Sequence, residues 1–213
     1  MDHPLLEQTV ESLKKNKFKV YVADDPEQAK GIIINEVLPE IGPGLVSYGD
    51  SETLFDTGAL GEIKAMSGKD GWQFLDTFEE GVERAEILQR RRDALQADIF
   101  FTGSNALTAK GQLVNLDMVG NRVGGIVWGP HHVVLTIGTN KLVEDLDQAM
   151  SRIREIAAPK NAARHNCKTP CAKTGKCLDC NSPERICNVW TITEKSWPAG
   201  RISVVLIKGD YGL

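Results

Sequence analysis

Residues 102–143 read TGSNALTAKGQLVNLDMVGNRVGGIVWGPHHVVLTIGTNKLV, a stretch in which apolar strands end in loops of glycine, asparagine and threonine. Residues 131–137 are a predicted strand, and a shorter strand places Asn115 and Asp117 on one face. Gly103 follows a third predicted strand, at 97–102. Because open α/β sheets place their ligand loops after the carboxyl ends of strands, these loops are the first candidates for a binding site.

Upstream of this stretch, helical and strand patterns alternate. Helices are expected at 26–37, before a break at Pro39, and at 52–60 and 80–95, the last of them long and amphipathic. Asp2 and Pro4 are expected to open a first helix. Strands are expected at 18–22 and 45–48. Downstream, a helix at 144–157 is expected to end at Pro159, and strands are expected at 189–193 and 202–207. The alternation predicts an α/β fold, a mostly parallel sheet with helices on both faces.

The composition is that of an ordinary globular protein. The 213 residues are 41% hydrophobic and 25% charged, with a formal net charge of −4. A negative charge argues against a surface that binds nucleic acid. Neither a signal-peptide pattern nor a long apolar run is present in the sequence, so we expect no membrane span and a cytoplasmic location.

All five cysteines lie within 21 residues, in the pattern Cys167-x3-Cys171-x5-Cys177-x2-Cys180-x6-Cys187. Lysine, asparagine, proline and glycine surround them, so this segment is too polar to form a core alone. Metal binding supplies folding free energy that apolar burial cannot supply here. We therefore interpret all five as candidate metal ligands, with Cys177 and Cys180 first.

Three interpretations of the cysteines stay open. An iron–sulfur cluster, of the four-iron type, fits a close pair with further cysteines nearby, although the spacing departs from the bacterial ferredoxin pattern. Four thiolates also suit a structural zinc ion. Disulfides or unligated thiols are the third interpretation, disfavoured by the odd count and the lack of a secretion signal.

Polar residues at the strand ends form a candidate anion site. Arg122 and Lys141 would supply charge stabilisation, with Arg122 in a tight turn, and Asp117 is the only carboxylate expected beside them for acid–base chemistry. Asp117 and Arg122 are thus the candidate catalytic residues. The sequence lacks a dinucleotide fingerprint and a P-loop, and glycine and asparagine are also ordinary turn formers. The expected substrate-binding residues are Thr102, Gly103, Asn105, Thr108, Asn115, Gly120, Asn121, Asn140 and Lys141.

Several motifs resemble the core signature of the LUD domain, the family of lactate-utilisation protein C, over roughly residues 3–160. They are TG-x-NA at 102–106, the turn and strand at 111–115, GNRV at 120–123, GP at 129–130 and NK at 140–141. The tail PCAKTGKCLDCNSPERIC, at 170–187, resembles a cysteine-rich extension on a subset of stand-alone LUD proteins. The loop GDSETL, at 49–54, keeps part of the SxTL-type turn of many relatives.

The resemblance implies a fold akin to the sugar-isomerase, CoA-transferase and formyltetrahydrofolate cyclo-ligase superfamily. It also implies a part in the oxidation of lactate to pyruvate beside iron–sulfur partner proteins. We expect a LUD-type domain at 1–160, a cysteine-rich segment at 161–190 and returning strands at 191–213. The expected partners are a small anionic metabolite, an iron–sulfur protein and further copies of the chain.

Two alternative functions remain open from the sequence. One is a non-catalytic regulatory or assembly module with a structural metal site. The other is an isomerase-like or cyclo-ligase-like enzyme that binds a phosphorylated ligand.

Overall fold

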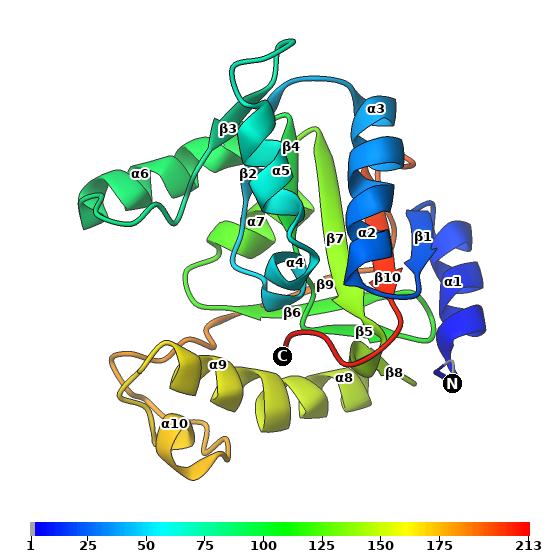
Figure 1. Cartoon of the computed structure of the whole chain (residues 1–213). Helices are drawn as coiled ribbons and strands as arrows, with labels where there is room; N and C mark the ends of the chain where they lie inside the picture. Colours follow the sequence, from blue (N-terminus) through cyan, green and yellow to red (C-terminus); the bar gives the residue numbers. More distant parts are fainter. Residues whose placement is uncertain (1–2) are drawn as a thin grey trace.

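The computed structural model describes residues 3–213, and its centre is a six-stranded sheet (Figure 1). All neighbouring strands in this sheet are parallel. The mostly parallel α/β sheet predicted from the sequence is therefore confirmed. The predicted role of Asp2 lies outside the described residues. The strand order is β1 (Lys19–Ala23), β10 (Ile202–Ile207), β7 (His132–Gly138), β4 (Ile99–Thr102), β2 (Leu45–Tyr48) and β3 (Gln73–Leu75).

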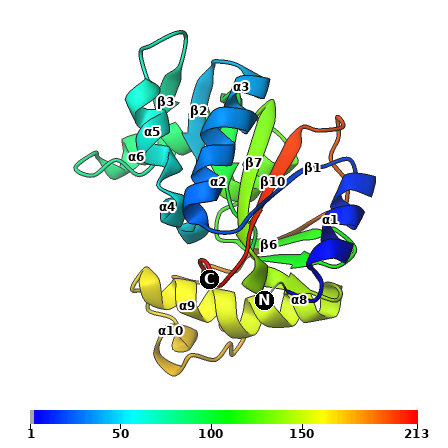
Figure 2. The same ribbon diagram turned by 45° about the vertical axis from the view of Figure 1, so that its right-hand side comes forward.

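Apolar side chains alternate between the two faces of this sheet, and both faces are covered (Figure 2). On one face, Val134 and Val205 pack against α2 (Pro26–Ile32), α4 (Glu52–Thr57) and α5 (Ala59–Met66). On the other face, Leu135 and Val204 pack against α1 (Leu6–Lys15) and α7 (Asn121–Val127). Burial on both faces explains why these strands have almost continuous apolar sequences.

A second, four-stranded sheet lies at the carboxyl edge of the first, with a long helix across it. Its order is β8 (Leu142–Val143), β5 (Ala106–Thr108), β6 (Leu113–Asp117) and β9 (Val189–Thr193). The helix is α8 (Leu146–Arg152), a π-helical turn (Ile153–Ala157) and α9 (Ala158–Arg164). Ala149 and Ile153 of this helix pack on Ala106 and Val114 of the sheet. The second sheet and this helix therefore both lie beside the carboxyl edge of the first sheet.

Two prolines that were expected to end helices lie inside them. The helix that begins at Pro26 passes through a π-helical turn (Ile33–Val37) and continues as α3 (Leu38–Ile41), which contains Pro39. Pro159 follows the other π-helical turn in the same way, inside α9. Proline removes one hydrogen bond and crowds the preceding turn, and the wider π-helical turn accommodates both effects.

Three further sequence predictions need correction. The helix expected at 52–60 is two helices, α4 and α5, divided at Gly58, whose φ is 69°. The helix expected at 80–95 is the shorter α6 (Arg84–Asp93), which has no buried residue and is not amphipathic. The turn expected at 120–122 is the start of α7, with Gly120 as its N-cap at a φ of 90°. The adjacent glycines are poor helix formers, so the sequence did not indicate α7. Gly125 is nevertheless required at this place, because a larger side chain would collide with the ring of Phe100.

The cysteine-rich segment leaves α9 and contains one short helix, α10 (Pro170–Thr174). After it, β9 joins the small sheet, and β10 lies between β1 and β7 in the large one. The division of the chain at residues 160 and 190 stays a prediction. Among residues 3–213, no helix is both long and apolar enough to cross a membrane.

Candidate functional site

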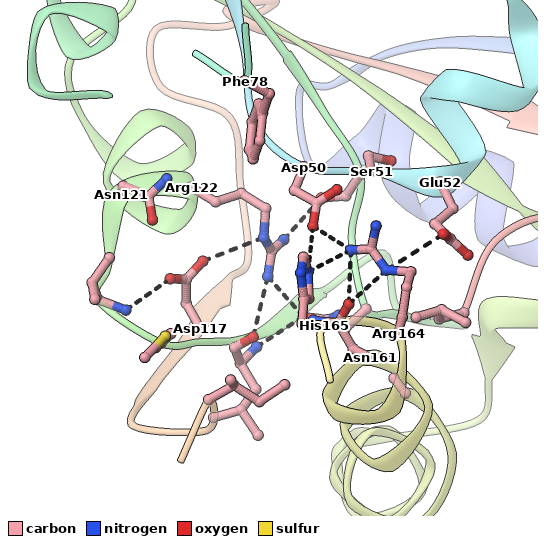
Figure 3. A pocket seen from close by; sticks show the side chains of 18 of the residues that line it. Asp50, Ser51, Glu52, Phe78, Asp117, Asn121, Arg122, Asn161, Arg164 and His165 are labelled. Atoms are coloured by element: carbon pink, nitrogen blue, oxygen red, sulfur yellow. Dashed lines mark hydrogen bonds and ion pairs between the residues drawn. The ribbon is translucent and has the colours of Figure 1, made fainter. Parts of the chain in front are cut away.

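A cleft of about 490 Å³ lies where the carboxyl ends of the parallel strands face α9 (Figure 3). The loops after β2, β4 and β7 all contribute to it, as expected for an open α/β sheet. Of the residues predicted for the site, Gly103, Asn105, Asp117, Asn121, Arg122 and Lys141 line this cleft. The remaining predicted residues, Thr102, Thr108, Asn115, Gly120 and Asn140, are not part of its lining.

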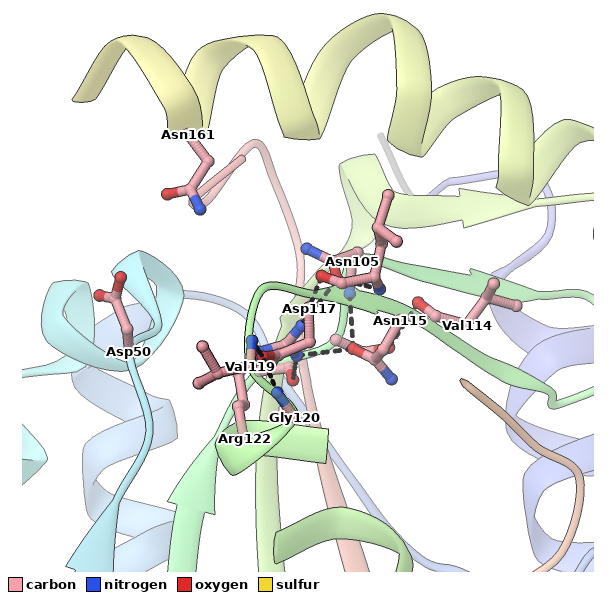
Figure 4. A network of polar contacts seen from close by, with 12 residues as sticks. Asp50, Asn105, Val114, Asn115, Asp117, Val119, Gly120, Arg122 and Asn161 are labelled. Carbon is pink, nitrogen blue, oxygen red and sulfur yellow. Dashed lines mark hydrogen bonds and ion pairs between the residues drawn. The ribbon is translucent and has the colours of Figure 1, made fainter. Parts of the chain in front are cut away.

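Arg122 is the centre of a buried polar network (Figure 4). Its Nη1 donates to Asn115 Oδ1 at 2.7 Å and to the Gly103 carbonyl at 3.1 Å. Its Nη2 donates to Asn105 Oδ1 at 2.8 Å and to the Leu116 carbonyl at 3.2 Å. Burial lowers the pKa of Arg122, although Asp117 opposes that shift. Arg122 therefore joins the loop after β4 to β6.

Asp117 is also occupied by contacts within the protein. Its Oδ1 accepts hydrogen bonds from the backbone of Val119 at 3.3 Å and of Gly120 at 2.9 Å. Its Oδ2 lies 3.3 Å from Arg122 Nε. Together these contacts shape the turn that leads into α7.

These contacts change the interpretation of Asp117 and Arg122. Arg122 is 9% exposed and Asp117 is 7% exposed. The guanidinium of Arg122 donates its hydrogen bonds to acceptors within the protein. A ligand would therefore be attracted by the positive charge of Arg122 rather than accept hydrogen bonds from it. The catalytic roles of both residues stay predictions, while their bracing role follows from the contacts.

A second polar cluster was not anticipated from the sequence. Asp50, in the loop after β2, accepts a hydrogen bond from Arg164 and lies 3.0 Å from His165 Nε2, both at the end of α9. Arg164 also donates to Asn161 Oδ1 at 2.8 Å and lies 3.4 Å from Glu52. Figure 3 shows the cluster facing the cleft, opposite Asp117 and Arg122.

The environment of Asp50 favours its charged form. Burial raises the pKa of Asp50, but the hydrogen bonds from His165 and Arg164 outweigh it, so the pKa lies below its ordinary value. A carboxylate that fixes a histidine beside a cleft is a common arrangement for proton transfer. The sequence signal for this pair was the GDSETL loop, in which Asp50 directly precedes Ser51.

The cleft is locally basic, although the chain as a whole is acidic. Five arginine and lysine side chains line it, against three carboxylates. The bases are Arg84, Arg91, Arg122, Lys141 and Arg164, and the acids are Asp50, Glu52 and Asp117. Lys141 is only partly charged near pH 7, so the excess rests on the four arginines, which still outnumber the three acidic side chains and favour an anionic ligand.

The five cysteines divide into two groups. Cys171, Cys177, Cys180 and Cys187 line a second, smaller pocket, whereas Cys167 lines the main cleft. All five are half-buried free thiols. Burial raises the pKa of Cys187, Arg185 lowers it, and the neighbouring thiols of Cys177, Cys180 and Cys171 raise it. Four of the five predicted ligands therefore lie around one pocket.

Arg185 connects the backbone at Cys180 to the backbone at Cys187. Its Nε donates to the Cys187 carbonyl at 2.9 Å, and its Nη1 donates to the Cys180 carbonyl at 2.5 Å. Within residues 3–213, no three histidine, cysteine or carboxylate side chains converge tightly enough to hold one metal ion. The donor type and number around the pocket nevertheless fit a thiolate-bound centre.

The cleft and the cysteine pocket share a wall. Ile186 lines both of them, and the adjacent residues Ala157 and Ala158 of the long helix line the cleft and the pocket respectively. Cys167, in the cleft, is only four positions from Cys171, in the pocket. A centre held by the four thiols would therefore lie next to a ligand in the cleft.

Comparison with known proteins identifies the fold and the family. A crystal structure described as a DUF162 family protein from Deinococcus radiodurans is similar, with a TM-score of 0.51 and 12% sequence identity. The similarity covers 96% of each chain. No match is found among curated protein sequences. The family model of the LUD domain matches residues 6–207. This chain therefore belongs to the LUD domain family.

Proposed function

We propose that this protein binds a small carboxylate, such as lactate or pyruvate, in the basic cleft and takes part in its oxidation or reduction. An iron–sulfur cluster would be held by Cys171, Cys177, Cys180 and Cys187. The observation that carries the proposal is the wall shared by the cleft and the cysteine pocket, to which Ile186 contributes on both sides.

The carboxylate would be attracted by the excess of basic side chains. Arg164 is the best-placed donor, because its Nε and Nη2 bind Asn161, Asp50 and Glu52 while no partner is found for its Nη1 among residues 3–213. Its contacts with Asp50 fix the guanidinium, so little side-chain entropy is lost when an anion binds. Arg122 would add charge from behind Asn105.

His165 would transfer the proton. Oxidation of a 2-hydroxy acid to a 2-oxo acid releases two protons and two electrons: His165 would accept the hydroxyl proton, and the hydrogen on C2 would leave as the second proton, to solvent, as the two electrons pass on. Asp50 and Arg164 would orient the imidazole, since His165 Nε2 lies 3.0 Å from the Asp50 carboxylate and 2.8 Å from Arg164 Nη2. Both electrons would pass, one at a time, through the cluster of the cysteine segment to an iron–sulfur partner protein.

The cysteine segment would provide the redox centre. When bound, an iron–sulfur cluster supplies one-electron transfer. Arg185 places a positive charge beside Cys187, which partly offsets the burial that raises the pKa of this thiol. Metal binding would draw the thiolates closer and supply folding free energy to this polar segment. A reducing cytoplasm would keep the thiols available for ligation.

Anaerobic purification followed by two measurements tests this proposal. Iron, sulfide and zinc are determined first, and binding of L-lactate and pyruvate is then measured by calorimetry. We expect iron and sulfide in the protein, and binding of at least one acid that weakens about 10- to 100-fold in Arg164→Gln. Arg92→Gln, at an exposed arginine outside the cleft, is the matched control.

Two results would overturn the proposal. Zinc as the only metal would remove the electron-transfer step. Failure of both acids to bind, together with stabilisation by a phosphorylated ligand, would favour the isomerase-like or cyclo-ligase-like alternative.

A further inference from the structure

Lys141 is a buried amine at the edge of the cleft. It ends the short 3-10 helix (Thr139–Lys141) that follows β7, and it is 5% exposed. It nevertheless contributes to the cleft lining. Lysine is rarely buried to this extent without a charged partner, so its surroundings need an explanation.

The hydrogen bonding of Lys141 leaves most of its donor capacity unused. Its Nζ donates to Thr53 Oγ1 at 2.8 Å. Thr53 in turn donates to the Tyr211 carbonyl at 3.1 Å, which fixes the acceptor. Within residues 3–213, no carboxylate forms an ion pair with Lys141.

The charges around Lys141 oppose its protonation. Burial, together with the nearby cations Arg152 and Arg122, lowers the pKa of Lys141 to about 7, and Asp56 and Glu52 oppose the shift. Both arginines are held in place: Arg152 donates to the Asn105 carbonyl at 2.6 Å, and Arg122 belongs to the network described above. A lysine that is desolvated and placed beside other cations is a typical activated amine nucleophile.

We propose that Lys141 is a nucleophile that forms a Schiff base with a small carbonyl compound in the cleft, of the 2-oxo acid class. The Nζ lone pair attacks the carbonyl carbon, a C–N bond forms, and the carbonyl oxygen leaves as water with the two amine hydrogens. Nothing else is consumed. The choice of a 2-oxo acid rests on the proposed function, whereas the nucleophilic amine rests on the geometry around Lys141.

The alternative role of Lys141 is that of a fixed cation that attracts an anion. Arginine keeps a positive charge but has no nucleophilic amine, so Lys141→Arg separates the two roles. A fixed cation would leave binding largely intact in this variant and would form no covalent product in the wild type.

Borohydride trapping tests the proposal on the full-length protein. The protein is incubated at pH 7.5 with pyruvate, glyoxylate or the neutral glycolaldehyde, reduced, and analysed by intact mass and peptide mapping. We expect one adduct per chain, at Lys141. A pKa of about 7 leaves roughly several hundred times more neutral amine at this pH than an ordinary surface lysine has.

Two variants control the trapping experiment. Lys141→Arg and the uncharged Lys141→Met should both lose the adduct, and circular dichroism with metal analysis checks that each variant is folded. Lys110→Arg, at an exposed lysine outside the cleft, should keep the adduct at Lys141. Adducts spread over surface lysines with Lys141 unmodified would overturn the proposal.

The three carbonyl probes separate this inference from the proposed function. Labelling of Lys141 by glycolaldehyde, without binding of pyruvate or lactate, would support the nucleophile and reject the proposed substrate. Calorimetric binding of pyruvate without any adduct would reject the nucleophile and leave the proposed function standing. The absence of both binding and labelling would reject the nucleophile and the proposed function together.

Discussion

Asp50 and His165 are 115 residues apart in the sequence, yet both line the cleft, and the Asp50 carboxylate lies 3.0 Å from His165 Nε2. Asp50 belongs to the loop after β2, and His165 follows the last turn of α9. Their contact therefore connects the parallel sheet to the helix that leads into the cysteine segment. Movement of that helix would alter the geometry of the proposed proton-transfer pair.

His165→Asn tests the proton-transfer role directly. We expect a loss of about 10²- to 10⁴-fold in lactate-dependent reduction of an artificial acceptor, with little change in pyruvate affinity, because only the transferring group is removed. His131→Asn, at an exposed histidine outside the cleft, should retain full activity. Full turnover in His165→Asn would eliminate this residue as the base.

Asp50 should contribute stability that disappears in acid. Its pKa is lower in the folded protein than in the unfolded chain, so its contribution is complete above the ordinary carboxyl pKa of about 4. The contribution is lost as the pH falls through the lower, folded-state pKa. We expect Asp50→Asn to cost about 1.5–3 kcal/mol of unfolding free energy at pH 7, and the difference from wild type to shrink below pH 4.

Urea unfolding between pH 2 and pH 7 measures this difference. Glu11→Gln, at an exposed carboxylate on α1, is the control and should show no comparable change. A constant gap between wild type and Asp50→Asn over the whole range would contradict the assigned pKa direction.

Lys141 should have a pH dependence of the same sign as that of Asp50, but in the alkaline range. Its folded-state pKa of about 7 is below its unfolded value, so the unfolded chain binds the proton more strongly between these two values. Unfolding free energy should therefore rise from about pH 7 to about pH 10, by up to about 1.4 kcal/mol per pH unit. Lys141→Met should lack this rise in urea unfolding, whereas Lys110→Met should keep it.

Whether a cysteine variant loses the cluster should depend on which of the two pockets the cysteine lines. Cys171→Ser, Cys177→Ser, Cys180→Ser and Cys187→Ser should each lose iron and sulfide, because each removes one of the thiols around the smaller pocket. Cys167→Ser should retain the cluster, since Cys167 lines the main cleft. Anaerobic absorbance and metal analysis provide the measurement, and circular dichroism checks the fold. Loss of the cluster in Cys167→Ser with retention in Cys171→Ser would reverse the assignment.

Arg122→Ala should mainly affect stability. Removal of the guanidinium takes one donor each from Asn105 Oδ1 and Asn115 Oδ1 and leaves the buried Asp117 carboxylate without its ion-pair partner, which should cost about 3–5 kcal/mol in urea unfolding. Arg122→Lys should restore only part of this, because one ammonium cannot reach all of these acceptors. The exposed Arg92→Ala should change stability by less than about 0.5 kcal/mol. A stable Arg122→Ala protein with weakened anion binding would instead support a direct ligand contact.

Much of the framework could be predicted from local sequence patterns. The strands at 45–48, 189–193 and 202–207 match the structure: the first and last are largely apolar and buried, whereas the β-branched run at 189–193 forms a partly exposed strand. The ends of the helices were harder to predict, since Pro39 and Pro159 act as helix breakers in isolation. Only the π-helical turns before them, which depend on packing against the sheets, allow the helices to continue.

The candidate site, like the framework, could be predicted from the sequence only in part. The sequence by itself determined the family signature, the strand-end loops and the confinement of the cysteines to one polar segment, because each is a local pattern. The tertiary structure decided that Arg122 is satisfied internally, that Asp50 meets His165, and that Cys167 is separated from the other thiols. The reason is physical: parallel strand order brings distant loops together, and burial determines whether a polar group binds the protein or faces the cleft.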